Sequence, residues 1–436
     1  MKNEANVAFY NASPKYEILM AVLIGLGICL TRLATAVSQI ALAMATMLAV
    51  YLWWKNGKRL NLNEAARQYI KVVCIWFIAS FVSIIDVDNK TVVFNYFLGD
   101  WIWRFMVFVL VVAFIHRREY LLKILAVFFC IFSIDCLTAC YQFFVLHWQR
   151  GRGFHGDYLD LTAIICMVLA MSAIILLDSH FEKNIKRFAF LGLFSSIAGL
   201  FGCFGRGAFL VSALVAPFYL YYYLRNSKKM AAIILIILCL LGGSVLSSPK
   251  YVERLSTTLN TTTNRSNVDR IWAWKASWDM FKDYPVNGVG LNNWGWYYRN
   301  AGYKYDEEKQ NLPHAHSNYM QPLAETGIIG FFGLLYFYGF SLIISFRRWI
   351  KQHSPSDLIF FTAFLSVMVL FGFFQPTYRL SSVLRVLWFI LALTIQLREG
   401  ISIGQHFTTF TLPRKLTKLV YTRPALSPLD FLRIGL

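Results

Sequence analysis

Blocks of about 16–24 apolar residues, separated by short polar segments, recur along most of this chain. A helix needs roughly 20 such residues to cross the hydrocarbon of a bilayer. The chain is 57% hydrophobic and only 15% charged, whereas a soluble domain carries about 25% charged residues. Because lipid offers no partner for backbone N–H and C=O groups, each block must satisfy them internally, as a helix. The sequence therefore predicts an all-α, polytopic membrane protein.

The lengths of the apolar blocks predict about twelve transmembrane helices. We expect them near residues 15–33, 37–54, 69–85, 101–115, 121–146, 158–177, 187–204, 207–224, 230–248, 318–346, 358–375 and 382–397. One connection, of about 70 residues, is far longer than ordinary loops. The predicted organisation has four parts: helices 1–9 in residues 1–248, the long loop 249–317, helices 10–12 in residues 318–397, and a basic tail 398–436.

Lys and Arg are concentrated in every second connection. "WKNGKRLNLNEAAR" and "HRREYLLK" are rich in them, whereas "TRLATAV" and "DVDNKTVVFNYFLGD" are poorer. Basic loops stay in the cytoplasm, so both termini are predicted to be cytoplasmic and the long loop external. The formal net charge of +19 is then mainly a topology signal plus attraction to anionic membrane lipids. No motif supports a nucleic-acid partner.

The long loop contains a predicted amphipathic helix. Ile271, Trp274, Trp278 and Phe281 recur at helical spacing. The pair Tyr284-Pro285 should end the helix, and "NGVG" should form a turn. We expect the helix to lie on the outer leaflet with its tryptophans as interface anchors. Stacking on sugar rings is the alternative.

Several arginines fall on the external face, where the positive-inside rule disfavours them. They are Arg152, Arg206, Arg265, Arg270 and Arg379. Arg206 is the most informative, because glycines on both sides allow a sharp turn and close approach of a ligand. A guanidinium in that position suits a phosphate or diphosphate. The alternative is an arginine that reaches to lipid headgroups.

Two histidines, His314 and His316, precede a segment that we expect to be one unbroken apolar helix, "NYMQPLAETGIIGFF". An imidazole with a pKa near 6.5 can act as general base towards a sugar hydroxyl. Asn318 and Glu325 follow on the same helix, and Glu325 could orient a histidine or an arginine. A histidine that only caps the helix is the alternative.

Other titratable groups and motifs add less. Asp135 lies inside the fifth predicted span and is a functional candidate for which the sequence suggests no partner. The chain has no P-loop, GxSxG or HExxH motif. No metal or cofactor is therefore predicted. The residues favour metal-free transfer from a lipid-linked diphosphate donor.

Four motifs together resemble the O-antigen ligase and polymerase superfamily of bacterial envelopes. They are "HAHSNYMQPLAETGIIGFFGLL", "DYPVNGVGLNNW", "DRIWAWKASWDMF" and "GRGAFL". The resemblance covers about residues 150–345, with the motifs in the family's order. The resemblance places the family's histidine on His316 and its two arginines on Arg206 and Arg270. Ser317 separates His316 from Asn318, whereas the family's asparagine follows its histidine directly. Gly205 stands where the family often has serine.

The resemblance implies a GT-C-like glycosyltransferase of the inner membrane, with its active site facing the periplasm. It would use an undecaprenyl-diphosphate-linked glycan as donor and invert the anomeric carbon. In a ligase the acceptor is the lipid A–core; in a polymerase it is another lipid-linked repeat unit, and in a third branch it is a protein Ser or Thr. The span number, the compact loop and "AETG" favour the ligase. A lipid-linked sugar transporter would suit the spans, but the two halves show no internal repeat.

Overall fold

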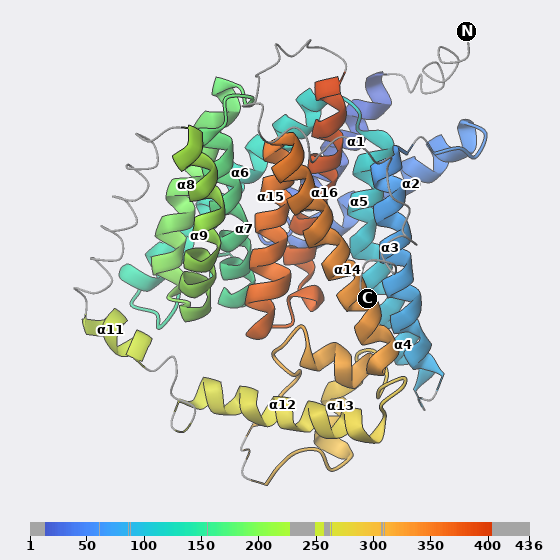
Figure 1. The fold of residues 1–436 in the computed structure, drawn as a ribbon, viewed down its shortest axis with the longest axis vertical. Coiled ribbons are helices and arrows are strands. Elements are labelled where there is room, and N and C mark those ends of the chain that lie inside the picture. Colours follow the sequence, from blue (N-terminus) through green and yellow to red (C-terminus); the bar gives the residue numbers. More distant parts are fainter. Residues whose placement is uncertain are drawn as a thin grey trace, which may run out of the picture. The chain divides into compact units, whose positions relative to one another are not determined.

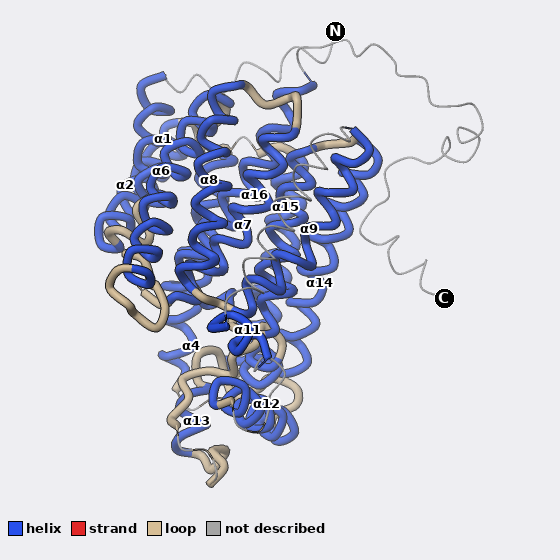
Figure 2. The backbone as a smooth tube through the Cα atoms, turned by 90° about the vertical axis from the view of Figure 1, so that its left-hand side faces the viewer, coloured by secondary structure: helices blue, strands red, loops and turns tan. Residues whose placement is uncertain are grey.

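A computed structural model describes residues 14–226, 249–256, 262 and 264–402, apart from the single residues 61, 86, 88, 155, 307 and 309. Within these residues all regular secondary structure is helical. The chain up to Arg398 forms one compact unit, in which the long helices run side by side (Figures 1 and 2). The predicted basic tail lies outside the described residues from position 403 onward.

Nine helical segments in the described residues are long and apolar enough to cross a membrane. They are α2 (Thr35–Lys55), α3 with a 3-10 turn (Glu64–Ile84), α4, a π-helical turn and α5 (Lys90–Phe114), α6 (Arg118–Phe144), α7 (Tyr158–Leu177), α8 (Lys183–Cys203), α14 (Met320–Gln352), α15 with its extension (Pro355–Phe373) and α16 (Ser381–Ser402). Two further helices, α1 (Pro14–Cys29) and α9 (Arg206–Asn226), also lie at predicted positions. The polytopic helical class is therefore confirmed. The expected span 230–248 lies outside the described residues, so the number twelve stays a prediction.

One expected external segment is partly helical instead. The sequence suggested a connection over residues 86–100, but α4 (Lys90–Tyr96) starts there and continues into the next span. The Asn89 side chain accepts a hydrogen bond from the Val92 N–H at 3.3 Å and caps the helix. The cap and the apolar residues that follow it extend this span towards its N-terminus.

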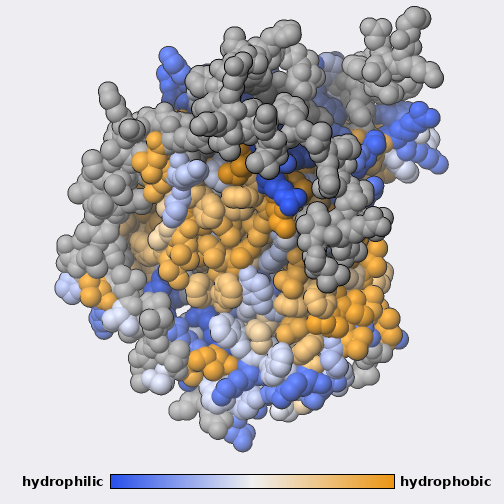
Figure 3. Space-filling view, viewed as in Figure 1, coloured by the Kyte–Doolittle hydropathy of each residue, from blue (hydrophilic) through white to orange (hydrophobic). Residues whose placement is uncertain are grey.

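The bundle packs closely where α8 offers small residues. Gly192, Gly199 and Gly202 lie on the side of α8 that meets α6, and a Cβ on Gly202 would lie 2.9 Å from the backbone of Cys140. Small residues of this kind let membrane helices approach each other. On the face drawn in Figure 3, apolar side chains cover the middle of the bundle, and hydrophilic ones lie towards both of its ends, including the end near α12 and α13.

Between α9 and α14 the chain forms α11 (Pro249–Ser256), α12 (Arg265–Asp283) and α13 (Trp294–Asn300). The predicted loop helix is confirmed as α12, which crosses one end of the bundle (Figure 1) and stops before Tyr284-Pro285. The buried face of α12 carries small side chains. Ala273 and Ala276 on this face pack into a second apolar core that includes Ala324 of α14. Of the predicted stripe, Trp278 is 49% exposed, whereas Ile271, Trp274 and Phe281 are half-buried. Its contact with the membrane stays a prediction.

Helix α14 is broken at Gly327, where φ is 58° and ψ is −161°. The expectation of one unbroken helix was wrong. The N–H groups of Val289 and Gly290 donate to the carbonyls of Ala324 and Glu325 at 2.9 and 2.8 Å, which the break leaves available. A Cβ on Gly327 would lie 2.2 Å from the Val286 carbonyl oxygen. The loop therefore docks into the break, and only glycine fits at that contact.

Candidate functional site

A pocket of about 70 Å³ lies between α7, α9, α12 and the turn that follows α15. Three arginines line it: Arg150, Arg206 and Arg270. Tyr158, Ser266 and Asn267 add hydroxyl and amide groups to the wall. Among the described residues that line the pocket, none is acidic. Such a wall is suited to a small anion with several oxygen atoms.

Arg206 is placed by the hinge that its neighbouring glycines predicted. Helix α8 ends with Phe204 in the left-handed conformation, at φ 53°, and α9 begins at Arg206. The Arg206 Nη2 donates to the Asn264 side chain at 3.3 Å, just before α12. The hinge therefore brings Arg206 to the wall of the pocket.

Arg270 is held in one orientation by α12 and by the turn after α15. Its Nε donates to the Phe374 carbonyl at 3.2 Å, and its Nη1 donates to the Ser266 carbonyl and hydroxyl at 2.9 and 2.8 Å. Burial lowers the pKa of Arg270, and the charges of Arg206 and Arg150 lower it further. Because these cations repel one another, an anion bound among them would be stabilised by all three.

Arg150 was missed by the sequence analysis, which chose Arg152 from the same "RGRG" stretch. The Arg150 guanidinium lies over the Tyr158 ring, 4.4 Å from its centroid, and lines the pocket. Arg152 is exposed and is not among the residues that line the pocket, so its predicted role stays a prediction. The one available signal was that Arg150, too, precedes a glycine.

Asp135 has a partner that the sequence did not reveal. Its Oδ2 lies 2.7 Å from Nε of Arg32, which is also buried, and its Oδ1 accepts from the Phe154 N–H at 2.7 Å. The Arg32 Nη2 donates to the Arg152 carbonyl at 2.7 Å. This ion pair therefore fastens the segment that carries Arg150 to the bundle.

His316 lies beside the pocket, in the loop before α14. Its Nδ1 is 3.1 Å from Oε1 of Gln375, and the adjacent Phe374 both lines the pocket and accepts from Arg270. Its backbone φ is 50°, a conformation that is uncommon for a residue other than glycine. The ring of His314 lies 4.2 Å from that of His316, centroid to centroid. The turn at residues 374–375 thus links His316, the predicted base, to Arg270, which is predicted to bind the diphosphate.

Both imidazoles are neutral at pH 7. Burial and the charge of Arg270 lower the pKa of His316 to about 4. Burial, His316 and the nearby arginines lower the pKa of His314 to about 2. His316 can therefore accept a proton at neutral pH, although in the unliganded protein it is a weaker base than an ordinary histidine.

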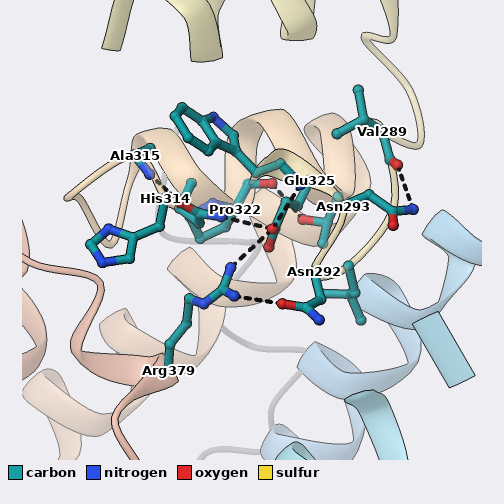
Figure 4. A network of polar contacts seen from close by, with 12 residues as sticks. Val289, Asn292, Asn293, His314, Ala315, Pro322, Glu325 and Arg379 are labelled. Atoms are coloured by element: carbon teal, nitrogen blue, oxygen red, sulfur yellow. Dashed lines mark hydrogen bonds and ion pairs between the residues drawn. The ribbon is translucent and has the colours of Figure 1, made fainter. Parts of the chain in front are cut away.

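The remaining candidates support the site from outside the pocket. Buried Asn318 donates to the Met368 carbonyl and the Thr377 hydroxyl at 2.8 and 2.7 Å, which ties the turn after α15 to the histidine loop. Arg379 lies between buried Glu325 and Asn292, at 3.0 and 2.6 Å (Figure 4).

Arg265 pairs with Asp269 and Glu308, at 2.9 and 2.8 Å. Like Arg379, it lies away from the pocket wall. The structure therefore brings Arg206 and Arg270 to one pocket with His316 beside it, and it separates Arg265 and Arg379 from them.

In the described part of the chain, no three His, Cys, Asp or Glu side chains are grouped so that they could hold a metal ion.

Residues 191–335 match a family model described as O-antigen ligase. This region contains Arg206, Arg270 and His316. No curated protein matches the chain. Residues 191–335 therefore belong to the O-antigen ligase and polymerase superfamily.

Proposed function

We propose that the protein is an O-antigen ligase, which moves a glycan from undecaprenyl diphosphate onto the lipid A–core. The observation that carries this proposal is the pocket with Arg150, Arg206 and Arg270 on its wall and His316 beside it. The family match supports function within the O-antigen ligase and polymerase family. The cationic pocket is what supports a diphosphate-activated donor in this proposal.

The three arginines would hold the diphosphate of the donor. Guanidinium groups bind phosphate oxygens in pairs of parallel hydrogen bonds, and their charge stabilises the diphosphate as it leaves. Arg270 is pre-oriented by Phe374 and Ser266. Its Nη2 has no hydrogen-bond partner among the described residues, so it is available to the donor.

His316 would act as general base. An acceptor hydroxyl gives its proton to the free ring nitrogen, and its oxygen attacks the anomeric carbon from the face opposite the diphosphate. The bond from carbon to the phosphate oxygen breaks, the electron pair stays with undecaprenyl diphosphate, and the anomeric carbon is inverted. Because a bound diphosphate would offset the charge of Arg270, it would raise the pKa of His316 and strengthen the base.

The setting of the reaction follows from the same proposal. We place the protein in the bacterial inner membrane, with both termini in the cytoplasm and the pocket facing the periplasm. Membrane lipids would surround the apolar helices, which are long enough to span a bilayer. The reaction requires no metal, cofactor or nucleic acid.

The test is the lipopolysaccharide pattern of a deletion strain, with lipid-linked glycans extracted in parallel. Loss of the O-antigen ladder, with long chains accumulating on undecaprenyl diphosphate, supports the ligase. A core that carries a single repeat unit would instead identify a polymerase, which the family match also supports. An unchanged pattern would rule out both and leave protein glycosylation or transport.

A further inference from the structure

His316 makes one side-chain hydrogen bond that fixes its ring. Its Nδ1 lies 3.1 Å from Oε1 of Gln375, which is only 3% exposed. An amide oxygen can only accept, so this contact requires the proton on Nδ1. The Nε2 atom is then left with the lone pair that a general base needs.

The backbone around Gln375 is held on both sides, so its side chain has little freedom. The Gln375 N–H donates to the Phe371 carbonyl at 3.2 Å, and its carbonyl accepts from the Thr377 N–H at 2.8 Å. Asn318 fastens this turn to the histidine loop, since its N–H donates to the Gly372 carbonyl at 2.7 Å. The distance between Gln375 and His316 is therefore set by the fold.

The charge that acts on the His316 ring comes from Arg270 on α12. The neighbouring His314 ring, 4.2 Å away from centroid to centroid, is neutral at pH 7. The Gln375 side chain is neutral and lies on a third element, the turn after α15. It can therefore orient the ring without adding charge. A carboxylate in its place would keep the hydrogen bond and add a negative charge.

We infer that Gln375 is the positioning residue of His316: it selects the tautomer with the proton on Nδ1 and aims Nε2 towards the acceptor. The inference rests on the proposed role of His316 as general base. It predicts that the charge and the hydrogen-bonding ability of the side chain at position 375 set the proton affinity of His316. The proton affinity in turn sets the rate of glycan transfer.

The experiment compares Gln375→Glu, Gln375→Met and the exposed control Gln310→Glu with the wild type in detergent. The first readout is modification of His316 by diethyl pyrocarbonate, followed across pH by mass spectrometry of its peptide. An opposite charge within about 4–6 Å raises a pKa by about 1–3 units. We expect the pH midpoint of His316 modification to rise by that amount in Gln375→Glu and to stay unchanged in Gln310→Glu.

The second readout is transfer from a lipid-linked donor in proteoliposomes. Gln375→Met should be at least about 10-fold slower, a part of the 10²–10⁴ that a general base contributes. In Gln375→Glu the acid limb of the pH profile should move upward with the modification midpoint. An unchanged midpoint in Gln375→Glu, or wild-type transfer by Gln375→Met, overturns the inference. If the midpoint rises but the wild type transfers no glycan, the contact stands and the proposed function fails.

Discussion

The Nη1 atom of Arg379 lies 3.0 Å from Oε1 of Glu325, whose side chain is fully buried. Glu325 precedes the break in α14 by two residues, and its carbonyl accepts the N–H of Gly290 from the docked loop. Its side chain reaches to the turn after α15. One residue therefore holds together the loop, the broken helix and the turn that carries Gln375.

Replacing Glu325 with alanine should destabilise the protein strongly. Removing one partner of a buried ion pair costs about 3–5 kcal/mol, because the other charge is left without compensation. The measurement is thermal unfolding in detergent. The double variant Glu325→Leu/Arg379→Met should recover much of the loss, since it removes both charges. A double variant as unstable as Glu325→Ala would show that the unpaired charge is not the cause.

His316→Ala should reduce transfer by about 10²–10⁴-fold, which is the contribution of a general base, with expression and folding intact. His314→Ala should be milder, since His314 acts only through its contact with the neighbouring ring and with the His316 N–H at 3.3 Å. Single-turnover assays with lipid-linked donor and core acceptor would compare them. Equal losses in the two variants would mean that the base has been assigned to the wrong residue.

Arg150→Ala and Arg152→Ala form a matched pair two residues apart. Arg150 lines the pocket, whereas the Arg152 side chain is exposed away from it. A hydrogen bond to a charged group contributes about 1.5–3 kcal/mol, so Arg150→Ala should lower kcat/KM about 10- to 100-fold. Arg152→Ala should behave like the wild type. The reverse order would contradict the pocket as the donor site.

Stability should fall as the pH drops below about 6.5. The pKa values of His316 and His314 in the folded protein, about 4 and about 2, lie below the ordinary value of 6.5. Between these values the unfolded chain binds more protons, so acid favours unfolding and full stability is present only above about pH 6.5.

Unfolding midpoints at pH 7 and pH 5 test this expectation. The double variant His314→Ala/His316→Ala should lose less stability than the wild type over that interval. The exposed His116→Ala variant is the control and should resemble the wild type. An identical loss in all three proteins would show that the buried imidazoles are not responsible.

Chelation should leave transfer unchanged. Three guanidinium groups supply the positive charge that would otherwise have to come from a divalent cation at the diphosphate. Activity before and after treatment with EDTA is the measurement. A loss that magnesium restores would overturn the metal-free mechanism.

The sequence by itself determined the helical membrane class and the positions of most helices, and it predicted three residues of the candidate site. These signals are local. The length of an apolar block predicts a transmembrane span, and the glycines on either side of Arg206 predict a hinge. The helical spacing of apolar residues, followed by Tyr-Pro, predicts α12. The motifs around Arg206, Arg270 and His316 carried the family resemblance, and the family match over residues 191–335 confirmed it.

Only the tertiary structure decided which charged groups meet. Arg150 and Arg152 look alike in sequence, yet Arg150 lines the pocket and Arg152 does not. Their segment is anchored by the Arg32–Asp135 pair, whose members are 103 positions apart. The break at Gly327 follows from the docked loop, because local propensity would have continued the helix. Gln375 has no sequence signal at all, since a glutamine becomes an orienting group only when folding brings it to an imidazole. Contacts between distant residues depend on packing, which local patterns do not encode.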